Sequence, residues 1–230
     1  REAQLKLLEV FPSMSRTFAL SGGTALELFY LKHRFSKDLD FFSAQYNFKE
    51  IDTLVTAFNN SFRRKLKLEN ELIVGGKARV RFYSLSVPGA TSPLKIDFIE
   101  DVLFKKPAIQ KFEGIPVYDV KNIYYQKIAT IVGTRLGLDE TGREIIGGRR
   151  DVRDIVDLYY LSKKICPLHK FIQKLSSIYK RGIVYWHRTY SRRDFKIEVI
   201  DLDIYDRNFD PSEVITHLDI EIQKIIAEVI

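Results

Sequence analysis

One stretch constrains the fold of this chain more than any other: the pair Gly22-Gly23, followed at a short distance by Asp38 and Asp40. An apolar run over residues 18–20 leads into the glycines, which permit a tight turn and let the backbone approach a ligand closely. Apolar spacing predicts a helix over residues 24–31. A strand should follow, and because side chains alternate along a strand, the two acids should point to the same face. The predicted order is strand, glycine turn, helix and carboxylate-bearing strand.

Two neighbouring carboxylates repel each other unless a cation lies between them. Hard oxygen ligands suit Mg²⁺, which proteins commonly hold through one or two carboxylates together with substrate phosphates. The alternative is a surface turn followed by a solvated acidic strand. Bulky apolar residues surround the acids, namely Leu39, Phe41 and Phe42. Strands rarely place two acids among such residues without a use for them, which favours a site.

This constellation resembles the nucleotidyltransferase superfamily of the DNA polymerase β type, in which a Gly-Gly or Gly-Ser turn holds the triphosphate and an Asp-x-Asp strand holds the metal ions. The flanking residues narrow the resemblance. Residues 22–26 (Gly-Gly-Thr-Ala-Leu) and 33–42 (His-Arg-Phe-Ser-Lys-Asp-Leu-Asp-Phe-Phe) are similar to the AbiEii/AbiGii toxin family, the toxins of bacterial abortive-infection toxin–antitoxin pairs. The resemblance extends from about Phe18 to Leu161.

The resemblance implies a third carboxylate on a neighbouring strand, and Asp97 in the run Lys95-Ile96-Asp97 matches it. Asp38, Asp40 and Asp97 would then be the catalytic, metal-binding residues. A solvated strand position is the alternative for Asp97. Its pairing with the other two acids favours the site, because the chemistry needs active-site acids on adjacent strands.

The resemblance also implies a set of phosphate-binding residues: Gly22, Gly23, Ser36 and Lys127. Lys127 falls on a helix expected from Val120 to about Leu136. A lysine extending its stem along a helix edge is the alternative interpretation.

The family shows an Arg-Asp-x-x-Asp-Leu pattern further on, which Arg153, Asp154, Asp157 and Leu158 match. Either acid, if it faces inward, could orient Lys127 by a charge-assisted hydrogen bond, and we place Asp154 in the nucleotide site on this basis. Acids that merely complement a helix dipole are the alternative.

The 230-residue chain contains one cysteine, Cys166, which excludes an internal disulfide and fits a reducing cytoplasm. No apolar run approaches the roughly 20 residues of a membrane span. The formal net charge of +7 favours an anionic partner. Ten of the Lys and Arg residues lie between Lys163 and Lys196 against one acid, whereas nine acids against two basic residues follow from Ile197 onward.

Aromatic residues are interleaved with the cations of this basic block, residues 163–196, and both kinds of group can contact RNA. Its predicted nucleic-acid-binding residues are Arg188, Arg192 and Arg193. The alternative is a helix that buries its rings and solvates its charges. Periodicity also predicts a strand over residues 195–204. The Asp-Leu-Asp run within it, residues 201–203, lacks a preceding glycine turn and helix, so we do not assign it to a site.

We therefore expect an α/β fold: a nucleotidyltransferase domain with a small mixed sheet, residues 1–119, and a mainly helical C-terminal domain, residues 120–230. The implied function is Mg²⁺-dependent transfer of a nucleoside monophosphate from NTP to an acceptor hydroxyl, with tRNA or another RNA as acceptor. An antitoxin is a possible partner, and no membrane is expected. Two alternatives stay open: a nucleotidyltransferase that modifies a small molecule or a protein, and a nucleotide- or RNA-binding module without turnover.

Overall fold

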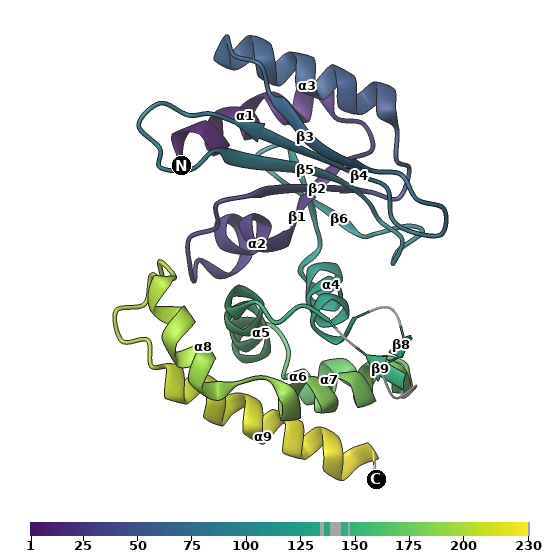
Figure 1. Ribbon diagram of the computed structural model, residues 1–230, viewed down its shortest axis with the longest axis vertical. Helices are drawn as coiled ribbons and strands as arrows, with labels where there is room; N and C mark the ends of the chain where they lie inside the picture. Colours follow the sequence, from purple (N-terminus) through teal and green to yellow (C-terminus); the bar gives the residue numbers. More distant parts are fainter. Residues whose placement is uncertain (134–135, 139–143, 147, 230) are drawn as a thin grey trace. The chain divides into compact units, whose positions relative to one another are not determined.

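The computed structural model describes residues 1–133, 136–138, 144–146 and 148–229. The chain divides into two compact units (Figure 1). Unit 1 comprises Arg1–Tyr30 and Ser36–Asn122, and unit 2 comprises Leu31–Phe35 and Ile123–Ile230. The predicted domain boundary between residues 119 and 120 stays a prediction.

Unit 1 contains a seven-stranded mixed sheet in the order β3-β4-β5-β2-β1-β7-β6. β2 pairs in parallel with β5 and β1 with β7, and the other pairs are antiparallel. The strands are β1 (Ala19–Ser21), β2 (Leu39–Ser43), β3 (Lys67–Leu72), β4 (Val80–Leu85), β5 (Leu94–Glu100), β6 (Ile109–Phe112) and β7 (Ile115–Tyr118). The mixed sheet with helices confirms the predicted fold class.

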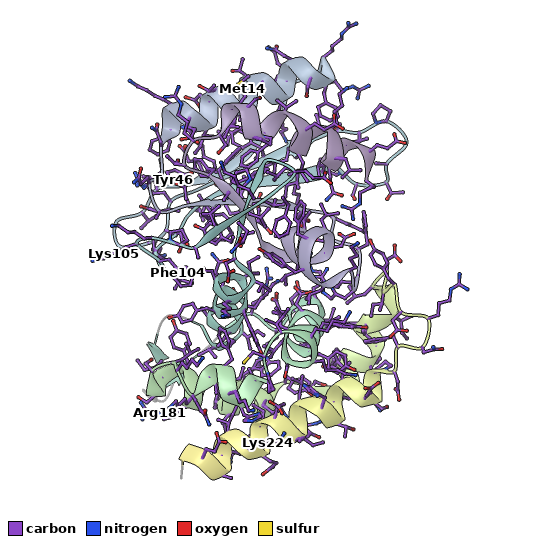
Figure 2. The ribbon with its side chains drawn as sticks, turned by 180° about the vertical axis from the view of Figure 1, so that it is seen from behind. Met14, Tyr46, Phe104, Lys105, Arg181 and Lys224 are labelled. Atoms are coloured by element: carbon purple, nitrogen blue, oxygen red, sulfur yellow. The ribbon has the colours of Figure 1, made fainter. Side chains whose placement is uncertain are left out.

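One face of the sheet packs against α1 (Glu2–Met14) and α3 (Phe48–Phe62), which lie on the same side of it (Figure 1). α3 begins at Phe48, because Asn47 caps it by accepting hydrogen bonds from two backbone amides. The Phe41 ring stacks on Phe11 of α1, with centroids 4.2 Å apart, and Phe58 of α3 lies beside it. Side chains fill the space between these helices and the sheet (Figure 2).

The opposite face of the sheet carries α2 (Gly22–Ala25), which continues as a π-helix over Leu26–Leu31. Burial alternates along β2: Leu39, Phe41 and Ser43 are buried, whereas Asp40 and Phe42 are half-buried. The apolar side of β2 therefore faces the α1–α3 core, and the acidic side faces away from it.

Unit 2 is mainly helical, as predicted. α4 (Val120–Val132) begins in unit 1 and ends four residues before the predicted position. The other helices are α5 (Val152–Lys164), α6 (Leu168–Ile172), α7 (Ser177–Thr189), α8 (Arg192–Glu198), a 3₁₀ turn (Val199–Asp201) and α9 (Pro211–Val229). β8 (Leu136–Leu138) pairs with β9 (Glu144–Ile146). Within the described ranges, no helix is both long enough and apolar enough to cross a bilayer.

Candidate functional site

The three predicted carboxylates come together in unit 1. Asp40 of β2 lies opposite Asp97 of the parallel strand β5, and Ser21 of β1 lies opposite Asp40 on the other side. Residues that oppose each other in a sheet point to the same face. Asp38 immediately precedes β2, and its charge acts on Asp97. Asp40 and Asp97 therefore share the face of the sheet that turns away from α1 and α3.

The glycine turn lies directly against one of these acids. Gly22 has a φ of +67°, a conformation that L side chains rarely adopt. A Cβ atom at Gly22 would overlap the Asp40 carboxylate. Gly23, which follows it in the first turn of α2, is buried. The sequence position of Gly22 thus has two requirements, left-handed backbone and no side chain, and glycine alone meets both.

Three polar side chains hold the segment that leads into β2. Gln4 of α1 donates its amide to the carbonyl oxygens of Ser36 and Lys37, at 2.9 and 3.0 Å. Glu27 accepts a 2.7 Å hydrogen bond from the Ser36 amide, and Arg1 donates to the same carboxylate. The Thr24 hydroxyl donates to the Asp38 carbonyl.

Sequence reasoning missed the roles of Gln4, Thr24 and Glu27. Only Glu27 carries a local signal, because it is an acid within the apolar helical run Ala-Leu-Glu-Leu-Phe, residues 25–29. Ser36, which was predicted to bind phosphate, is anchored here through its own backbone and is 8% exposed.

Asp97 is a carboxyl with a raised pKa. Burial and the negative charges of Asp40 and Asp38 raise its pKa to about 7, and Lys95 opposes this only in part. A divalent cation would relieve the repulsion that raises this pKa, and hard carboxylate oxygens are the donors that Mg²⁺ prefers. Among the described residues, no three His, Cys, Asp or Glu side chains form a ready metal cluster. The donor set fits Mg²⁺ held by carboxylates together with substrate phosphates, and metal binding stays a prediction.

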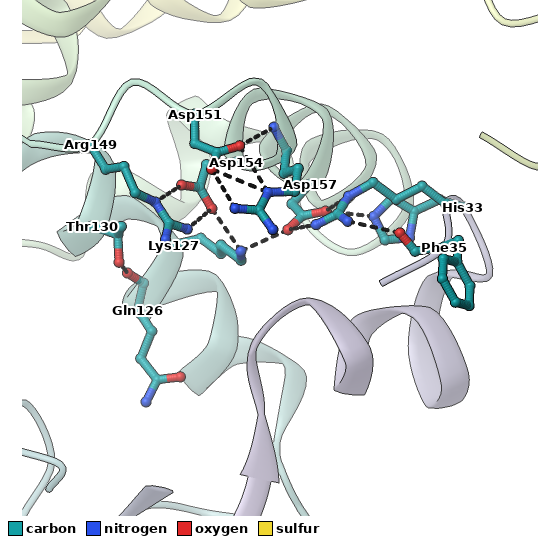
Figure 3. Close-up of polar contacts among 11 residues, drawn as sticks. His33, Phe35, Gln126, Lys127, Thr130, Arg149, Asp151, Asp154 and Asp157 are labelled. Atoms are coloured by element: carbon teal, nitrogen blue, oxygen red, sulfur yellow. Dashed lines mark hydrogen bonds and ion pairs between the residues drawn. The ribbon is translucent and has the colours of Figure 1, made fainter. Parts of the chain in front are cut away.

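Lys127 lies in unit 2, in a buried ion network (Figure 3). Its amine is 2.7 Å from Asp154 Oδ1 and 2.7 Å from Asp157 Oδ2. Burial works against the charged amine, but the two carboxylates outweigh it and raise the pKa of Lys127. Lys127 is therefore a cation at neutral pH, and it does not extend along a helix edge into water. Its contact with nucleotide phosphate stays a prediction.

Asp154 is fully buried, and both of its oxygens have partners. Besides Lys127, it accepts two hydrogen bonds from the Arg149 guanidinium, at 2.7 and 2.9 Å. Burial opposes its charge, but Lys127 and Arg149 hold the pKa of Asp154 below its ordinary value. The predicted orientation of Lys127 by a carboxylate is thus present in the geometry. The place of Asp154 in the nucleotide site stays a prediction.

The acids of α9 lie against the basic block. Arg192 donates to Asp219 at 2.8 Å, and Lys163 contacts Glu213 at 2.6 Å. The Trp186 and Tyr190 rings are buried and stack on each other, with centroids 4.9 Å apart. The exposed residues of the block include the arginines at 181, 188 and 193 (Figure 2 labels the first) and the Tyr185 ring. RNA binding by Arg188, Arg192 and Arg193 stays a prediction.

The family to which the chain matches is one of nucleotidyltransferases. The family model for the nucleotidyl transferase AbiEii toxin of type IV toxin–antitoxin systems matches residues 6–223. The chain therefore belongs to the AbiEii family, which confirms the resemblance drawn from residues 22–42. No curated protein matches the chain.

Two solved structures from Helicobacter pylori share the fold. One is a candidate nucleotidyltransferase, with a TM-score of 0.60 and 17% sequence identity, covering 99% of this chain and 93% of that one. The other is JHP933, with a TM-score of 0.59 and 16% identity, covering 99% of this chain and 90% of that one. Likeness at this identity concerns the fold.

Proposed function

We propose that this protein transfers a nucleoside monophosphate from an NTP to a hydroxyl group of RNA, with tRNA as the acceptor and Mg²⁺ as the required ion. The observation that carries the proposal is the register of β2 and β5, which places Asp40 opposite Asp97 on the face that Gly22 borders. Adjacent acids beside a glycine turn are what phosphoryl-transfer chemistry with divalent ions requires.

In the reaction, an acceptor oxygen attacks the α-phosphorus of the NTP, and the bond from that phosphorus to the β-phosphate oxygen breaks, so that pyrophosphate leaves. Asp38, Asp40 and Asp97 would hold Mg²⁺, which neutralises charge on the triphosphate and makes the attacking hydroxyl more acidic. Asp97, which lies opposite Asp40 in the register of the two strands, would also help to take the hydroxyl proton.

Phosphate binding falls to the glycine turn and to Lys127. Gly22 and Gly23 would bring their backbone amides close to an anion, since glycine has no side chain of its own. The Ser36 hydroxyl would add a donor on the segment that leads into β2. Lys127 would contribute its charge, oriented by Asp154.

The charge of the basic block favours RNA over a small-molecule acceptor. Arg188 and Arg193 are exposed, and the charges of such residues lower the free energy of phosphate binding. A small-molecule or protein acceptor would share the whole carboxylate site and stays the alternative. A cognate antitoxin is the further partner that the family implies, and we propose that one exists.

The test is incubation of the protein with Mg²⁺, total RNA and each NTP in turn, labelled on either the α- or the γ-phosphate. Transfer of the monophosphate predicts that the α-label enters an RNA of tRNA size and that the γ-label appears in pyrophosphate. RNA labelled by the γ-phosphate would instead indicate kinase chemistry. Label that appears only on protein or on small molecules would favour the alternative acceptor.

A further inference from the structure

The segment Leu31–Phe35 belongs to unit 2, although unit 1 precedes and follows it in the chain. Its backbone is held at several points by other parts of unit 2. The Phe35 amide donates to the Asp203 carbonyl at 2.8 Å, and the Tyr205 amide donates to the His33 carbonyl at 3.0 Å. Lys164 Nζ also donates to the Leu31 carbonyl. The segment is therefore fixed to α5 and to the chain that follows the 3₁₀ turn.

A side-chain clasp holds the same segment more firmly. The Arg34 guanidinium donates to both oxygens of Asp157, with Nε 2.7 Å from Oδ1 and an Nη atom 2.8 Å from Oδ2. His33 Nε2 lies 2.7 Å from Oδ1 of the same carboxylate. Arg34 is 2% exposed and Asp157 is fully buried. A guanidinium fork on a carboxylate fixes the direction as well as the distance of its partner.

Immediately after this clasp, between Phe35 and Ser36, the chain passes from unit 2 to unit 1. Ser36 belongs to unit 1, where Gln4 and Glu27 bind its backbone. Asp38, the first of the predicted metal ligands, follows two residues later. The Arg34 clasp thus lies at the beginning of the short connection that carries the carboxylates into β2.

Arg34, Lys127 and His33 outweigh the cost of burying Asp157 and keep the pKa of this carboxyl well below its ordinary value. Apolar side chains of similar volume often replace a buried ion pair without loss of stability. What they would lack is the directed contact that the guanidinium fork adds to the backbone hydrogen bonds of the segment. This argues that the clasp serves geometry.

We propose that Arg34 is a positioning residue for the metal-binding carboxylates, which it serves through its fork on Asp157. Arg34 touches neither substrate nor metal. It fixes the segment from which Asp38 and Asp40 continue, so that loss of the fork loosens the carboxylates while their chemistry stays intact. The proposal rests on the proposed function, because it takes Asp38 and Asp40 as metal ligands.

The test compares Arg34→Lys, which keeps the charge and loses the fork, with Arg79→Lys. Arg79, which immediately precedes β4 in unit 1, makes a similar fork on Glu100 at the end of β5, at 2.8 and 2.9 Å. Binding of Mn²⁺ in the presence of inorganic tripolyphosphate, which carries a phosphate chain without a base, is followed by electron paramagnetic resonance. Hydrogen exchange of the peptide over residues 31–38 is measured in parallel. Near-ultraviolet circular dichroism checks that each variant is folded.

Arg34→Lys is expected to weaken Mn²⁺ binding about tenfold, as changes to residues that orient metal ligands typically do, and to speed exchange over residues 31–38. Arg79→Lys should keep the affinity of the parent. If Arg34→Lys does not fold, Arg34→Gln, which keeps two donors without the charge, takes its place with the same expectation. A folded Arg34 variant with the parent's Mn²⁺ affinity would overturn the proposal alone. A parent protein that binds no Mn²⁺ would overturn the metal site, and the positioning role with it.

Discussion

Gly22 and Asp40 lie so close together that a single methyl group on the glycine would overlap the carboxylate. Seventeen residues separate Gly22 from Asp40 in the sequence. The glycine turn and the acidic strand nevertheless pack directly against each other. The turn needs a left-handed backbone, and the strand needs the space that a side chain would fill.

Gly22→Ala should therefore damage the site more than the fold. The left-handed backbone costs an alanine about 1–2 kcal/mol, and the overlap displaces the Asp40 carboxylate. Displacement on the ångström scale is expected to lower nucleotidyl transfer on the order of 100-fold. Gly89→Ala is the matched control, because Gly89 has a φ of +75° and no atom within 4 Å of the added Cβ. Similar unfolding midpoints with unequal activities are predicted; equal activities would refute the close packing.

Asp97→Asn should stabilise the metal-free protein at neutral pH. The ordinary pKa of this carboxyl is 3.8 and its pKa in the folded protein is about 7. The unfolded chain therefore loses the proton first, and the free energy of unfolding falls as pH rises through this window and levels off above it. Asp97→Asn has no carboxyl at this position, so its free energy of unfolding does not fall in this window. The stability of the variant relative to the parent should therefore grow with pH to the order of 1–2 kcal/mol, after allowance for the partial exposure of Asp97.

Urea unfolding from pH 4 to pH 8, without divalent ions, measures this difference. Excess Mg²⁺ should reverse the order, because the cation stabilises only the protein with all its carboxylates. An advantage of Asp97→Asn that is the same at every pH would show that the raised pKa of Asp97 is not its source.

Lys127→Met should leave the fold intact and weaken NTP binding. The methionine keeps the apolar stem, while Asp154 retains Arg149 and Asp157 retains Arg34, so no buried carboxylate loses its last partner. We expect the KM for NTP to rise about tenfold, because the lost contact is with the triphosphate. Titration with inorganic tripolyphosphate should show the same loss. Unchanged affinity for tripolyphosphate would remove Lys127 from the phosphate site.

The ion pair between Arg192 and Asp219 predicts opposite effects for two kinds of variant. Replacing Arg188, Arg192 and Arg193 by alanine should weaken tRNA binding and flatten its salt dependence by about one power per lost phosphate contact. Asp219→Asn frees the Arg192 guanidinium from its 2.8 Å partner and should tighten binding at low salt. Filter binding at several salt concentrations measures both. If neither changes the affinity, the block is a solvated face and a different acceptor is indicated.

The sequence predicted those parts of the fold that local patterns determine. The helix predicted to begin at Val120 begins at that residue. The predicted strand over residues 195–204 was wrong, because apolar residues recur there at both the strand spacing and the helix spacing. Phe195 and Val199 are buried one helical turn apart, Ile197 is exposed, and Ser191 caps α8 by accepting from the Asp194 amide. Short alternation cannot be told from a helix when every second residue is apolar.

In the candidate site, too, sequence patterns predicted some residues, whereas contacts between residues distant in the sequence were not predicted. The family pattern placed the three acids, and the register of β2 and β5 brings two of them face to face. The Arg34–Asp157 clasp joins residues 123 positions apart, so no local spacing indicates it. The Asp-Leu-Asp run at residues 201–203, which we did not assign to a site, begins at the last residue of the 3₁₀ turn. The Asp203 carbonyl instead accepts the Phe35 amide.

The central claim is that the Asp38–Asp40–Asp97 group transfers a nucleotide, and transfer of an α-labelled NTP to RNA by Asp40→Asn tests it most directly. The control is Asp52→Asn, which changes an exposed acid of α3 that pairs with Arg81. Both variants should fold. We predict that Asp52→Asn labels RNA at the rate of the parent and that Asp40→Asn labels none above background, at any Mg²⁺ concentration. Labelling by folded Asp40→Asn at the parent's rate would contradict the account.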